Sequence, residues 1–219
     1  MKGVFFDLDN TLYAADSAVF DLIDGRINTY MRDVVGIESG RVDYLRRHYW
    51  DKYGVTLRGL MYEHGTDAEH YLEYVHDIDV SSRLGPNPEL KRSLHAMPER
   101  RFVFTNGSSD HARRVLNCLD IADCFEHIYD IRVSNYIPKP QLDPYRAALA
   151  HSGMRGDECV MVEDSLPNLR TAARLRMATI LVDSAAQGAV ADIDAVVPGA
   201  RDATEVIDSW REMGRGCEL

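Results

Sequence analysis

Residues 3–11 read GVFFDLDNT, an apolar run that ends abruptly in acidic and polar residues. Short apolar runs rich in β-branched and aromatic side chains are typical of strands that are buried on both faces of a parallel sheet. We therefore predict a buried strand over residues 3–7, with its carboxyl end at Asp7. In extended backbone every second side chain points the same way, so the carboxylates of Asp7 and Asp9 are expected on one side.

Similar short runs recur along the chain, at residues 102–105, 128–131, 159–162, 179–182 and, more weakly, 195–197. Helical spacing of apolar residues fills the gaps between several of them, at residues 110–119, 143–151 and 167–176. Strands that alternate with helices predict an α/β fold, in which a Rossmann-like parallel sheet is flanked by helices.

Residues 14–85 interrupt this rhythm, because apolar residues there keep helical spacing without a strand pattern. The first such series is Phe20, Ile23, Ile27, Tyr30 and Val34. The run Gly85-Pro86-Asn87-Pro88 ends the interruption and is typical of a hinge. We predict a core domain over residues 1–13 and 86–219 and an inserted α-helical cap domain over residues 14–85.

The composition excludes several classes of partner. The 219-residue chain has a net charge of −10, with no basic stripe to offset it, which argues against a nucleic acid polymer as a partner. No apolar run is long enough to span a membrane, and the strand from Lys2 to Phe6 follows Met1 too closely for a signal peptide. A cytoplasmic location is expected, and monomer and homodimer both stay open.

The cysteines agree with that location, since they form no CxxC pair and suit a reducing compartment. For the same reason we expect no cysteine-based metal site from Cys118, Cys124, Cys159 and Cys217.

Polar clusters follow four of the predicted strands. In an open α/β sheet, ligands bind outside the carboxyl ends of the strands, so we expect these clusters to converge. They are Asp7-Leu8-Asp9-Asn10-Thr11, Thr105-Asn106-Gly107-Ser108, Pro138-Lys139-Pro140 and Glu163-Asp164-Ser165, with Asn168 one turn after the last.

The carboxylates of this predicted site create an electrostatic conflict. Two carboxylates about 4 Å apart repel by roughly 4 kcal/mol at an effective dielectric constant of about 20. A cation between them removes this cost, and hard oxygen ligands without a nearby histidine or cysteine favour Mg²⁺. The Thr105 hydroxyl, the backbone N–H groups after it and the Lys139 ammonium are candidates for holding the oxygens of a phosphate.

Taken in order, the four clusters resemble the motifs of the haloacid dehalogenase superfamily. DLDNT is similar to its first motif, FTNGS to the second, Lys139 within YIPKP to the third and VEDSLPN to the fourth. The resemblance covers the whole chain, and the helical insert resembles the cap that follows the first motif. The strings TLRGLMYEHG, YVHDID and VFTNGS also resemble the pyrimidine 5′-nucleotidase-like subgroup.

The resemblance implies a role for each acidic residue of the motifs. Asp7 is the nucleophile that forms an aspartyl-phosphate. Asp9 protonates the leaving alkoxide and then deprotonates the hydrolytic water. Mg²⁺ is held by Asp7, the Asp9 carbonyl and Asp164, and Glu163 assists directly or through water.

The resemblance also implies how the phosphoryl group is bound. Lys139 is counted among the catalytic residues with Asp7 and Asp9, and it shares the phosphoryl group with Thr105, Asn106 and Gly107. Thr11 and Asn168 support these side chains from behind.

Cap residues are the candidates for recognising the leaving group. Arg58 and His64 lie in a string that matches the subgroup and are our substrate-binding candidates, as are His76 and Asp77 more weakly; a solvated helical face explains such residues equally well. Tyr13 and Tyr136 stand beside the first and third motifs, where they either line the mouth of the site or pack. An aromatic group is expected to pack in the cap core rather than stack on a base: Tyr49, Trp50 and Tyr53.

These features predict a Mg²⁺-dependent phosphatase for a small phosphorylated metabolite, with a pyrimidine nucleoside 5′-monophosphate as the leading substrate. A sugar phosphate phosphatase and a phosphomutase on the same core stay open as alternatives. A haloacid dehalogenase needs no Mg²⁺ and gives Asp9 no purpose, and a phosphonatase offers Asp9 no ester oxygen. A non-enzymatic binding module is disfavoured because every core motif is intact, and a protein substrate because the cap restricts access.

Overall fold

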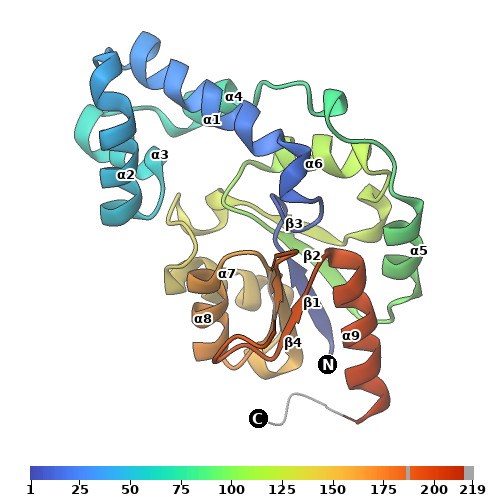
Figure 1. Cartoon of the computed structure of the whole chain (residues 1–219). Coiled ribbons are helices and arrows are strands. Elements are labelled where there is room, and N and C mark those ends of the chain that lie inside the picture. The colour runs from blue at the N-terminus through green and yellow to red at the C-terminus, as the bar shows by residue number, and fades with distance from the viewer. Residues whose placement is uncertain (186–187, 215–219) are drawn as a thin grey trace.

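Six parallel strands form one sheet in the computed structural model, which describes residues 1–185 and 188–214. The strands are β1 (Gly3–Phe6), β2 (Arg100–Phe104), β3 (His127–Tyr129), β4 (Cys159–Glu163), β5 (Ala178–Val182) and β6 (Ala195–Val197). Their order is β3-β2-β1-β4-β5-β6 (Figure 1). The chain runs outward from β1 to β3 and returns to β4 on the other side of β1. Open α/β sheets bind ligands at such a reversal, which here lies between β1 and β4.

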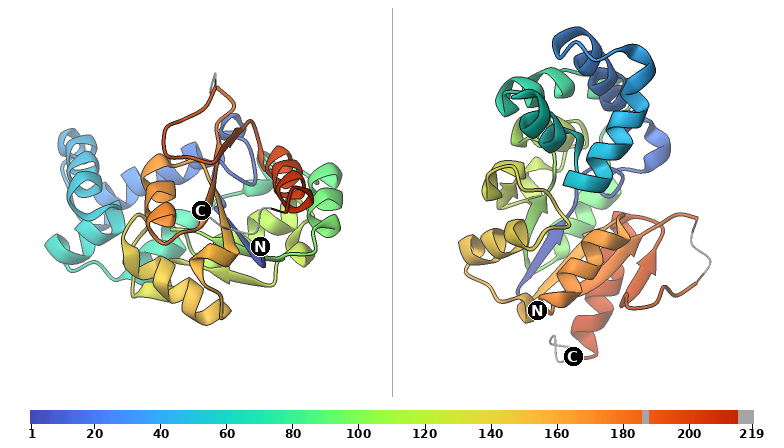
Figure 2. Two further views of the ribbon diagram at one scale, coloured as in Figure 1. Left: turned by 90° about the horizontal axis from the view of Figure 1, so that it is seen from below. Right: turned by 90° about the vertical axis from the view of Figure 1, so that its left-hand side faces the viewer.

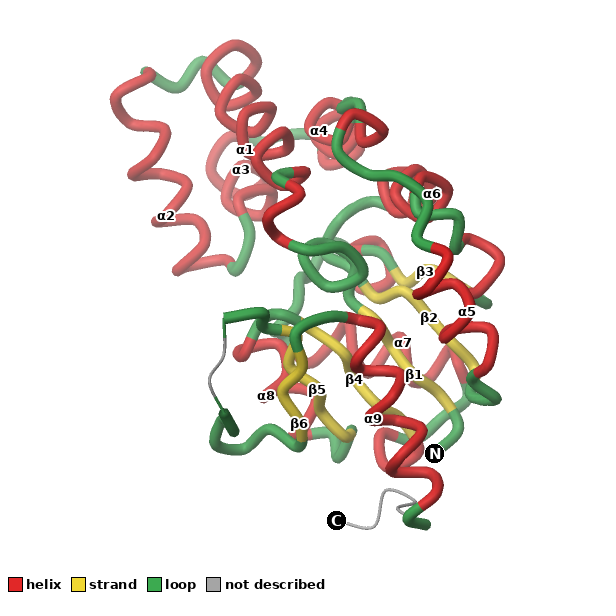
Figure 3. The backbone as a smooth tube through the Cα atoms, turned by 45° about the vertical axis from the view of Figure 1, so that its right-hand side comes forward, coloured by secondary structure: helices red, strands yellow, loops and turns green. Residues whose placement is uncertain are grey.

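The register of the sheet brings the ends of three strands to one level. Phe6 of β1 aligns with Val103 of β2 and with Val162 of β4. Asp7 therefore leaves the sheet beside Glu163, the last residue of β4. The loops that follow these strand ends lie between the sheet and the cap helices (Figure 3).

Alternate residues of each strand pack on opposite faces of the sheet, as the twofold repeat of a strand requires. Val4, Phe6 and Val103 belong to one apolar cluster, with helices α5 (Pro88–Ala96), α6 (Ser109–Cys118) and α9 (Ala200–Glu212). Phe5 and Phe102 belong to another, with α7 (Leu142–Ser152) and α8 (Leu166–Arg174). Each fully buried side chain of this size contributes about 1.5–3 kcal/mol, so both clusters hold the strand ends firmly.

The cap consists of α1 (Val19–Thr29), α2 (Val42–Tyr53), α3 (Thr56–His64) and α4 (Ala68–His76), with a π-helical turn at Tyr30–Val34. It stands over the carboxyl edge of the sheet (Figures 1 and 2). Its apolar cluster includes Tyr30, Tyr49, Leu60 and Leu72. Gly59 allows α3 to approach α2, because a Cβ there would lie 2.2 Å from Tyr49 Cγ. The structure confirms the predicted fold class, a parallel sheet flanked by helices with a helical cap.

The chain crosses between cap and core twice. Val19 and Val80 pack in the core cluster, whereas Ile23 and Val75 pack in the cap cluster. A cavity of about 490 Å³ lies at the two crossings and is lined by residues 12–14, 83–89 and Leu119. The domain boundaries at residues 13/14 and 85/86 stay a prediction.

Several details of the sequence interpretation are wrong. The strand predicted over 128–131 ends at Tyr129, because the Asp130 side chain accepts from the backbone N–H of Arg132 and starts a turn. Pro88 belongs to the first turn of α5, with Asn87 as its N-cap, rather than to a loop. Three predicted apolar packing residues are instead exposed: Trp50 at 62%, Val34 at 46% and Phe20 at 39%. For Val34, the π-helical turn adds a residue to the repeat and rotates it off the buried face.

Two further expectations from the sequence concern the cysteines and a membrane-spanning segment. Of the cysteines, Cys217 lies outside the described residues. Among the helices that are described, none is both long and apolar enough to cross a bilayer.

Candidate active site

The turn after β1 fixes Asp7 at the edge of the sheet. Asp7 donates its backbone N–H to the Val162 carbonyl (2.9 Å), which extends the β1–β4 ladder by one residue. The Leu8 carbonyl then accepts from the N–H of Thr11 (3.3 Å), and Asn10 adopts φ 61°, a left-handed conformation that asparagine tolerates. The Thr11 hydroxyl lies 3.4 Å from Asp7 Oδ2, so the turn folds back to support the carboxylate, as predicted for Thr11.

Lys139 joins three segments of the core. Its Nζ lies 2.7 Å from each of Asp7 Oδ1, Glu163 Oε2 and the Phe104 carbonyl. Lys139 is 2% exposed, and all three of its side-chain N–H donors are used. Burial alone would lower the pKa of Lys139, but the neighbouring carboxylates outweigh it and raise that pKa. The ammonium is therefore a permanent positive charge beside Asp7.

One ammonium does not neutralise the carboxylates around it. Burial, and then repulsion from Glu163, raise the pKa of Asp7 to about 7 against the opposing effect of Lys139. Burial likewise raises the pKa of Glu163 to about 7, and it raises the pKa of Asp164. Three carboxylates and one lysine leave an excess of negative charge at neutral pH. The site therefore has the electrostatics of a cation site.

The donor set fits a divalent cation that prefers oxygen. Carboxylate oxygens of Asp7, Glu163 and Asp164 lie within 4.8 Å of one another. Besides its contact with Lys139, Glu163 already uses its oxygens as acceptors for Asn168 Nδ2 (2.9 Å) and the Ser165 N–H (3.3 Å). Asp7 and Asp164 are therefore the better candidates for direct contact with a cation. Asp164 also lines a cavity of about 380 Å³, which gives this side of the site access to solvent.

The segment after β2 holds the Lys139 loop in place. The Asn106 side chain accepts from the Lys139 backbone N–H (2.8 Å) and donates to the Lys139 carbonyl (3.1 Å). The Thr105 hydroxyl accepts from the Gly107 N–H at 2.9 Å. The Asn106 amide is thus occupied by the lysine backbone, and its side chain positions Lys139.

Backbone N–H groups remain available at the strand ends, among them those of Leu8, Asp9 and Asn106. No described residue accepts from the N–H of Leu8, Asp9 or Asn106. Two of them follow β1 and one follows β2, on either side of the strand ends that carry Asp7 and Thr105. Clustered backbone N–H groups in turns bind anions. With Lys139 they form a candidate cradle for phosphoryl oxygens.

Asp9 is held by the side chains of Tyr13 and His111. The Tyr13 hydroxyl donates to Asp9 Oδ1 at 2.5 Å, and His111 Nε2 lies 2.9 Å from the same oxygen. Burial alone would raise the pKa of Asp9, but His111 and Tyr13 outweigh it and lower that pKa. In the substrate-free protein the Asp9 carboxylate is therefore ionised at neutral pH.

Comparison with known proteins places the chain in a family. A family model described as a haloacid dehalogenase-like hydrolase matches residues 1–176. The chain belongs to this hydrolase family.

One curated relative of this hydrolase is Phosphate metabolism protein 8 of Saccharomyces cerevisiae, which is 26% identical over 195 residues. The alignment covers 82% of the chain and 61% of the yeast protein, so the chain spans less than two thirds of that relative.

Solved structures show the same fold. A 2-haloacid dehalogenase from Pseudomonas syringae is 21% identical, with a TM-score of 0.63 and coverage of 96% of this chain and 99% of that one. A haloacid dehalogenase-superfamily phosphatase from Thermococcus onnurineus is 16% identical, with a TM-score of 0.64 and coverage of 94% and 98%.

Three of the cap candidates of this hydrolase, Arg58, His64 and Asp77, have their side-chain partners within the cap. Arg58 donates to the Tyr62 hydroxyl (3.2 Å), and His64 Nε2 lies 2.8 Å from the Tyr49 hydroxyl, so both pair within the cap. Asp77 is paired with Arg26 at the exposed surface. Of the expected aromatic packing, Tyr49 is fully buried in the cap cluster and Tyr53 packs against it.

Glu69 of α4 connects the cap to the core. Its carboxylate accepts from Arg132 (2.8 and 2.6 Å) and from the Tyr136 hydroxyl. Tyr136 therefore ties the cap down instead of only lining the site. A second contact lies at Gly54, where an added Cβ would be 3.1 Å from Pro138, immediately before Lys139.

Sequence reasoning missed His111 and assigned His76 only to the cap. His111 lies on α6, after the second motif, and is fully buried against Asp9. Burial lowers the pKa of His76, the last residue of α4, to about 3, so its ring is neutral. A histidine four residues after Gly107 was the available signal, since one helical turn from a strand-end loop returns a side chain toward that loop.

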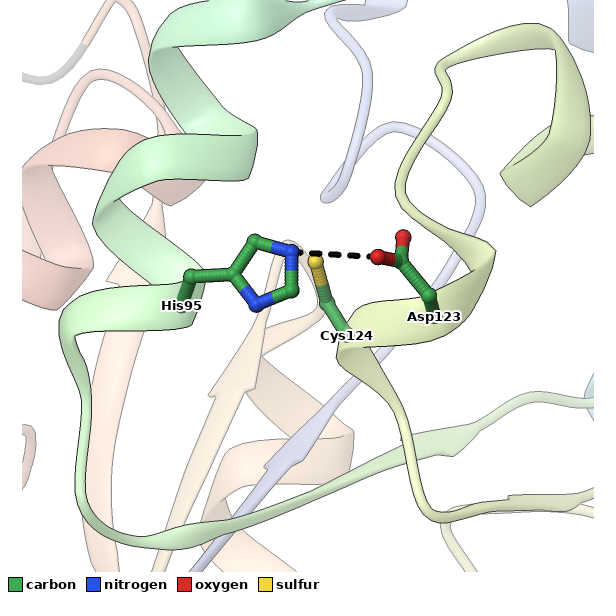
Figure 4. A group of neighbouring side chains, drawn as sticks. All are labelled: His95, Asp123 and Cys124. Atoms are coloured by element: carbon green, nitrogen blue, oxygen red, sulfur yellow. Dashed lines mark hydrogen bonds and ion pairs between the residues drawn. The ribbon is translucent and has the colours of Figure 1, made fainter.

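A second group of possible metal ligands lies away from these motifs (Figure 4). Donor atoms of His95, Asp123 and Cys124 lie within 4.8 Å of one another. Lys91 already supplies a positive charge here, with its Nζ 3.3 Å from Asp123 Oδ1, and Cys124 is buried in the apolar core cluster. Asp7, Glu163 and Asp164 are the better supported metal site.

Proposed function

We propose that this hydrolase is a Mg²⁺-dependent phosphatase that cleaves small phosphate monoesters through an aspartyl-phosphate on Asp7. One observation carries the proposal: a buried carboxylate lies at the strand ends with an ammonium 2.7 Å from one of its oxygens, close to backbone N–H groups that lack partners. Such an arrangement attracts a phosphate and places it against a nucleophile.

Two displacements at phosphorus account for the reaction. An Asp7 oxygen attacks phosphorus, the P–O bond to the alcohol breaks, and Asp9 gives its proton to the departing oxygen. A bound phosphate dianion repels the Asp9 carboxylate, which favours the protonated form that this step requires. Asp9 then removes a proton from water, which attacks the aspartyl-phosphate and releases free phosphate and Asp7.

Mg²⁺ would be held by Asp7, the Asp9 carbonyl and Asp164, and it would neutralise charge that develops on the phosphoryl oxygens. Lys139 and the N–H groups of Asp9 and Asn106 would orient those oxygens. Glu163 would position Lys139 by accepting from its side-chain ammonium, and Asn106 by accepting from its backbone N–H.

Replacement of the nucleophile tests the chemistry. Asp7→Asn should abolish Mg²⁺-dependent turnover of p-nitrophenyl phosphate, because an amide is a poor nucleophile. Asp43→Asn makes the same change at an exposed position on α2 and should keep wild-type turnover. Full activity of Asp7→Asn would remove the aspartyl-phosphate from the mechanism.

For the substrate we propose a pyrimidine nucleoside 5′-monophosphate. The support is the resemblance of the strings around Arg58 and His64 to the nucleotidase-like subgroup, on a cap that stands over the strand ends (Figure 2). The name of the yeast relative supports phosphate chemistry without choosing an alcohol.

A panel of phosphorylated metabolites, with free phosphate as the readout, tests this choice. UMP and CMP should rank high, and dominance of sugar phosphates would remove the nucleotidase assignment. Sugar isomers formed in place of free phosphate would identify a phosphomutase. Chloride release from 2-chloropropionate is expected to be absent, since a dehalogenase has no use for the proton on Asp9.

A further inference from the structure

The two oxygens of Asp9 have different surroundings. Tyr13 and His111 both contact Oδ1, at 2.5 and 2.9 Å. Among residues 1–185 and 188–214, no donor contacts Oδ2. A carboxylate held by one oxygen keeps a fixed plane while its other oxygen stays free to exchange a proton.

The His111 ring has one possible assignment at this contact. The Asp9 carboxylate only accepts, so His111 Nε2 carries the hydrogen. Its Nδ1 is buried and has no partner among the described side chains and backbone. The ring is held by stacking instead: it lies against the ring of His76, with centroids 4.6 Å apart and planes inclined by 13°.

His76 belongs to the cap and is itself fixed. Its Nδ1 lies 2.9 Å from the Leu72 carbonyl and 3.0 Å from Ser108 Oγ, the N-cap of α6. Its own carbonyl accepts from Arg114 of α6 at 2.7 Å. The end of cap helix α4 is therefore bound to the helix that carries His111.

We propose that His111, with Tyr13, anchors Asp9 by Oδ1 so that Oδ2 alone exchanges the proton with the leaving group, and that His76 makes this anchor depend on the docked cap. His111 and His76 are positioning residues in this proposal, which rests on the phosphatase function proposed above. When the P–O bond breaks, the proton moves from Asp9 Oδ2 to the alkoxide oxygen, while Tyr13 and His111 keep theirs throughout.

A pair of aryl phosphates isolates this role. The p-nitrophenolate ion leaves with little help from an acid, whereas phenolate needs more. Because kcat/KM covers only the steps through transfer to Asp7, it excludes hydrolysis of the intermediate. The readout is the ratio of kcat/KM for phenyl phosphate to that for p-nitrophenyl phosphate.

His111→Met and His111→Gln are matched in length, but only glutamine restores an N–H donor. A positioned general acid is worth roughly 10²–10⁴-fold, so loss of one of its two anchors should lower the ratio about 10-fold in His111→Met. His111→Gln should recover most of the ratio. His95→Met makes the same change at a histidine that contacts Asp123 and should leave the ratio unchanged.

An equal loss of kcat/KM with both substrates, or no recovery of the ratio in His111→Gln, would overturn the proposed anchoring role. A purely structural role does not discriminate between leaving groups. Failure of the phosphatase function is distinguishable, since the wild type would then release phosphate from neither compound. Thermal unfolding of each variant identifies any that fail to fold.

The cap contribution has its own comparison. His76→Ala removes the stacked ring and should also lower the ratio, by less than His111→Met, whereas His76→Phe keeps a ring and should lie closer to the wild type. A wild-type ratio in His76→Ala would separate the anchor from the cap and overturn that half of the proposal.

Discussion

Lys139 and Asp9 of the core site differ from Arg58 of the cap in how their polar groups are paired. Lys139 contacts three separate core segments, and Asp9 is held by a residue 102 positions away. In the cap, Arg58 pairs with Tyr62 one helical turn later. Long-range buried contacts fix these core groups, whereas the local, exposed pair of Arg58 and Tyr62 leaves its part of the cap surface free to change.

The sharpest way to break this comparison is to remove one lysine from each region. Lys139→Met leaves two buried carboxylates without their counter-ion, and breaking such a group costs about 3–5 kcal/mol. Lys52→Met removes an exposed partner of Glu63 on the cap. Urea unfolding of the metal-free proteins should show a large decrease in the free energy of unfolding for Lys139→Met and no measurable change for Lys52→Met. Similar losses in both would contradict the distinction.

The stability of the metal-free protein should depend on pH through the buried carboxylates of the core site. Because Asp7 and Glu163 have a pKa of about 7 when folded, against ordinary values of 3.8 and 4.5, the folded protein binds more protons than the unfolded chain in that window. Stability is therefore highest below about pH 4 for these groups and is lost as pH rises toward 7, at about 1.4 kcal/mol for each unit of pKa shift.

In the proposed function Mg²⁺ would take the place of those protons, so it should raise the melting temperature more at about pH 8 than at about pH 5. Asp164→Asn should reduce the gain at the higher pH. Equal gains at both pH values would show that the metal does not bind these carboxylates.

The smallest expected effect lies at the junction of the two regions. Arg132 and Tyr136 lower the pKa of Glu69 to about 2, so this carboxylate stabilises the docked cap above its ordinary pKa and the contribution is lost as pH falls toward 2. Exposed pairs of this kind are worth about 1 kcal/mol or less, a factor of about five in population.

Glu69→Gln should therefore speed hydrogen exchange of the α4 amides several-fold at neutral pH. Glu63→Gln, whose contacts stay within the cap, should leave α4 exchange as in the wild type. Equal exchange in the two variants would mean that the Glu69 contacts do not dock the cap.

The arrangement of the core could be predicted from the sequence because the sheet topology determines where the strand ends lie. The pattern around Asp7 marks a strand end, and a parallel sheet brings all such ends to one edge, so the convergence of Asp7, Lys139 and Asp164 needed no side-chain detail. The fold class and the approximate strand positions followed for the same reason, with bounds that differ by one or two residues and a strand that ends early at Asp130.

What the sequence missed depends on helix rotation and side-chain direction. His111 reaches Asp9 only because α6 is turned to bury that face, and Asn106 turned out to hold the Lys139 backbone. Spacing in the cap predicted helices correctly, but it did not reveal the π-helical turn that rotates Val34 outward. The contacts of Arg58 and His64 within the cap could not be predicted either, because they depend on side-chain direction.

The cap helices come from one continuous stretch of chain, and the two crossings that bound it meet at a single cavity. An insertion with neighbouring ends can be exchanged by one recombination event without disturbing the sheet, whereas the chemical groups come from four separate stretches that no such event can move together. The cap can therefore be exchanged as a unit, whereas the chemical groups of the core are held together by the sheet.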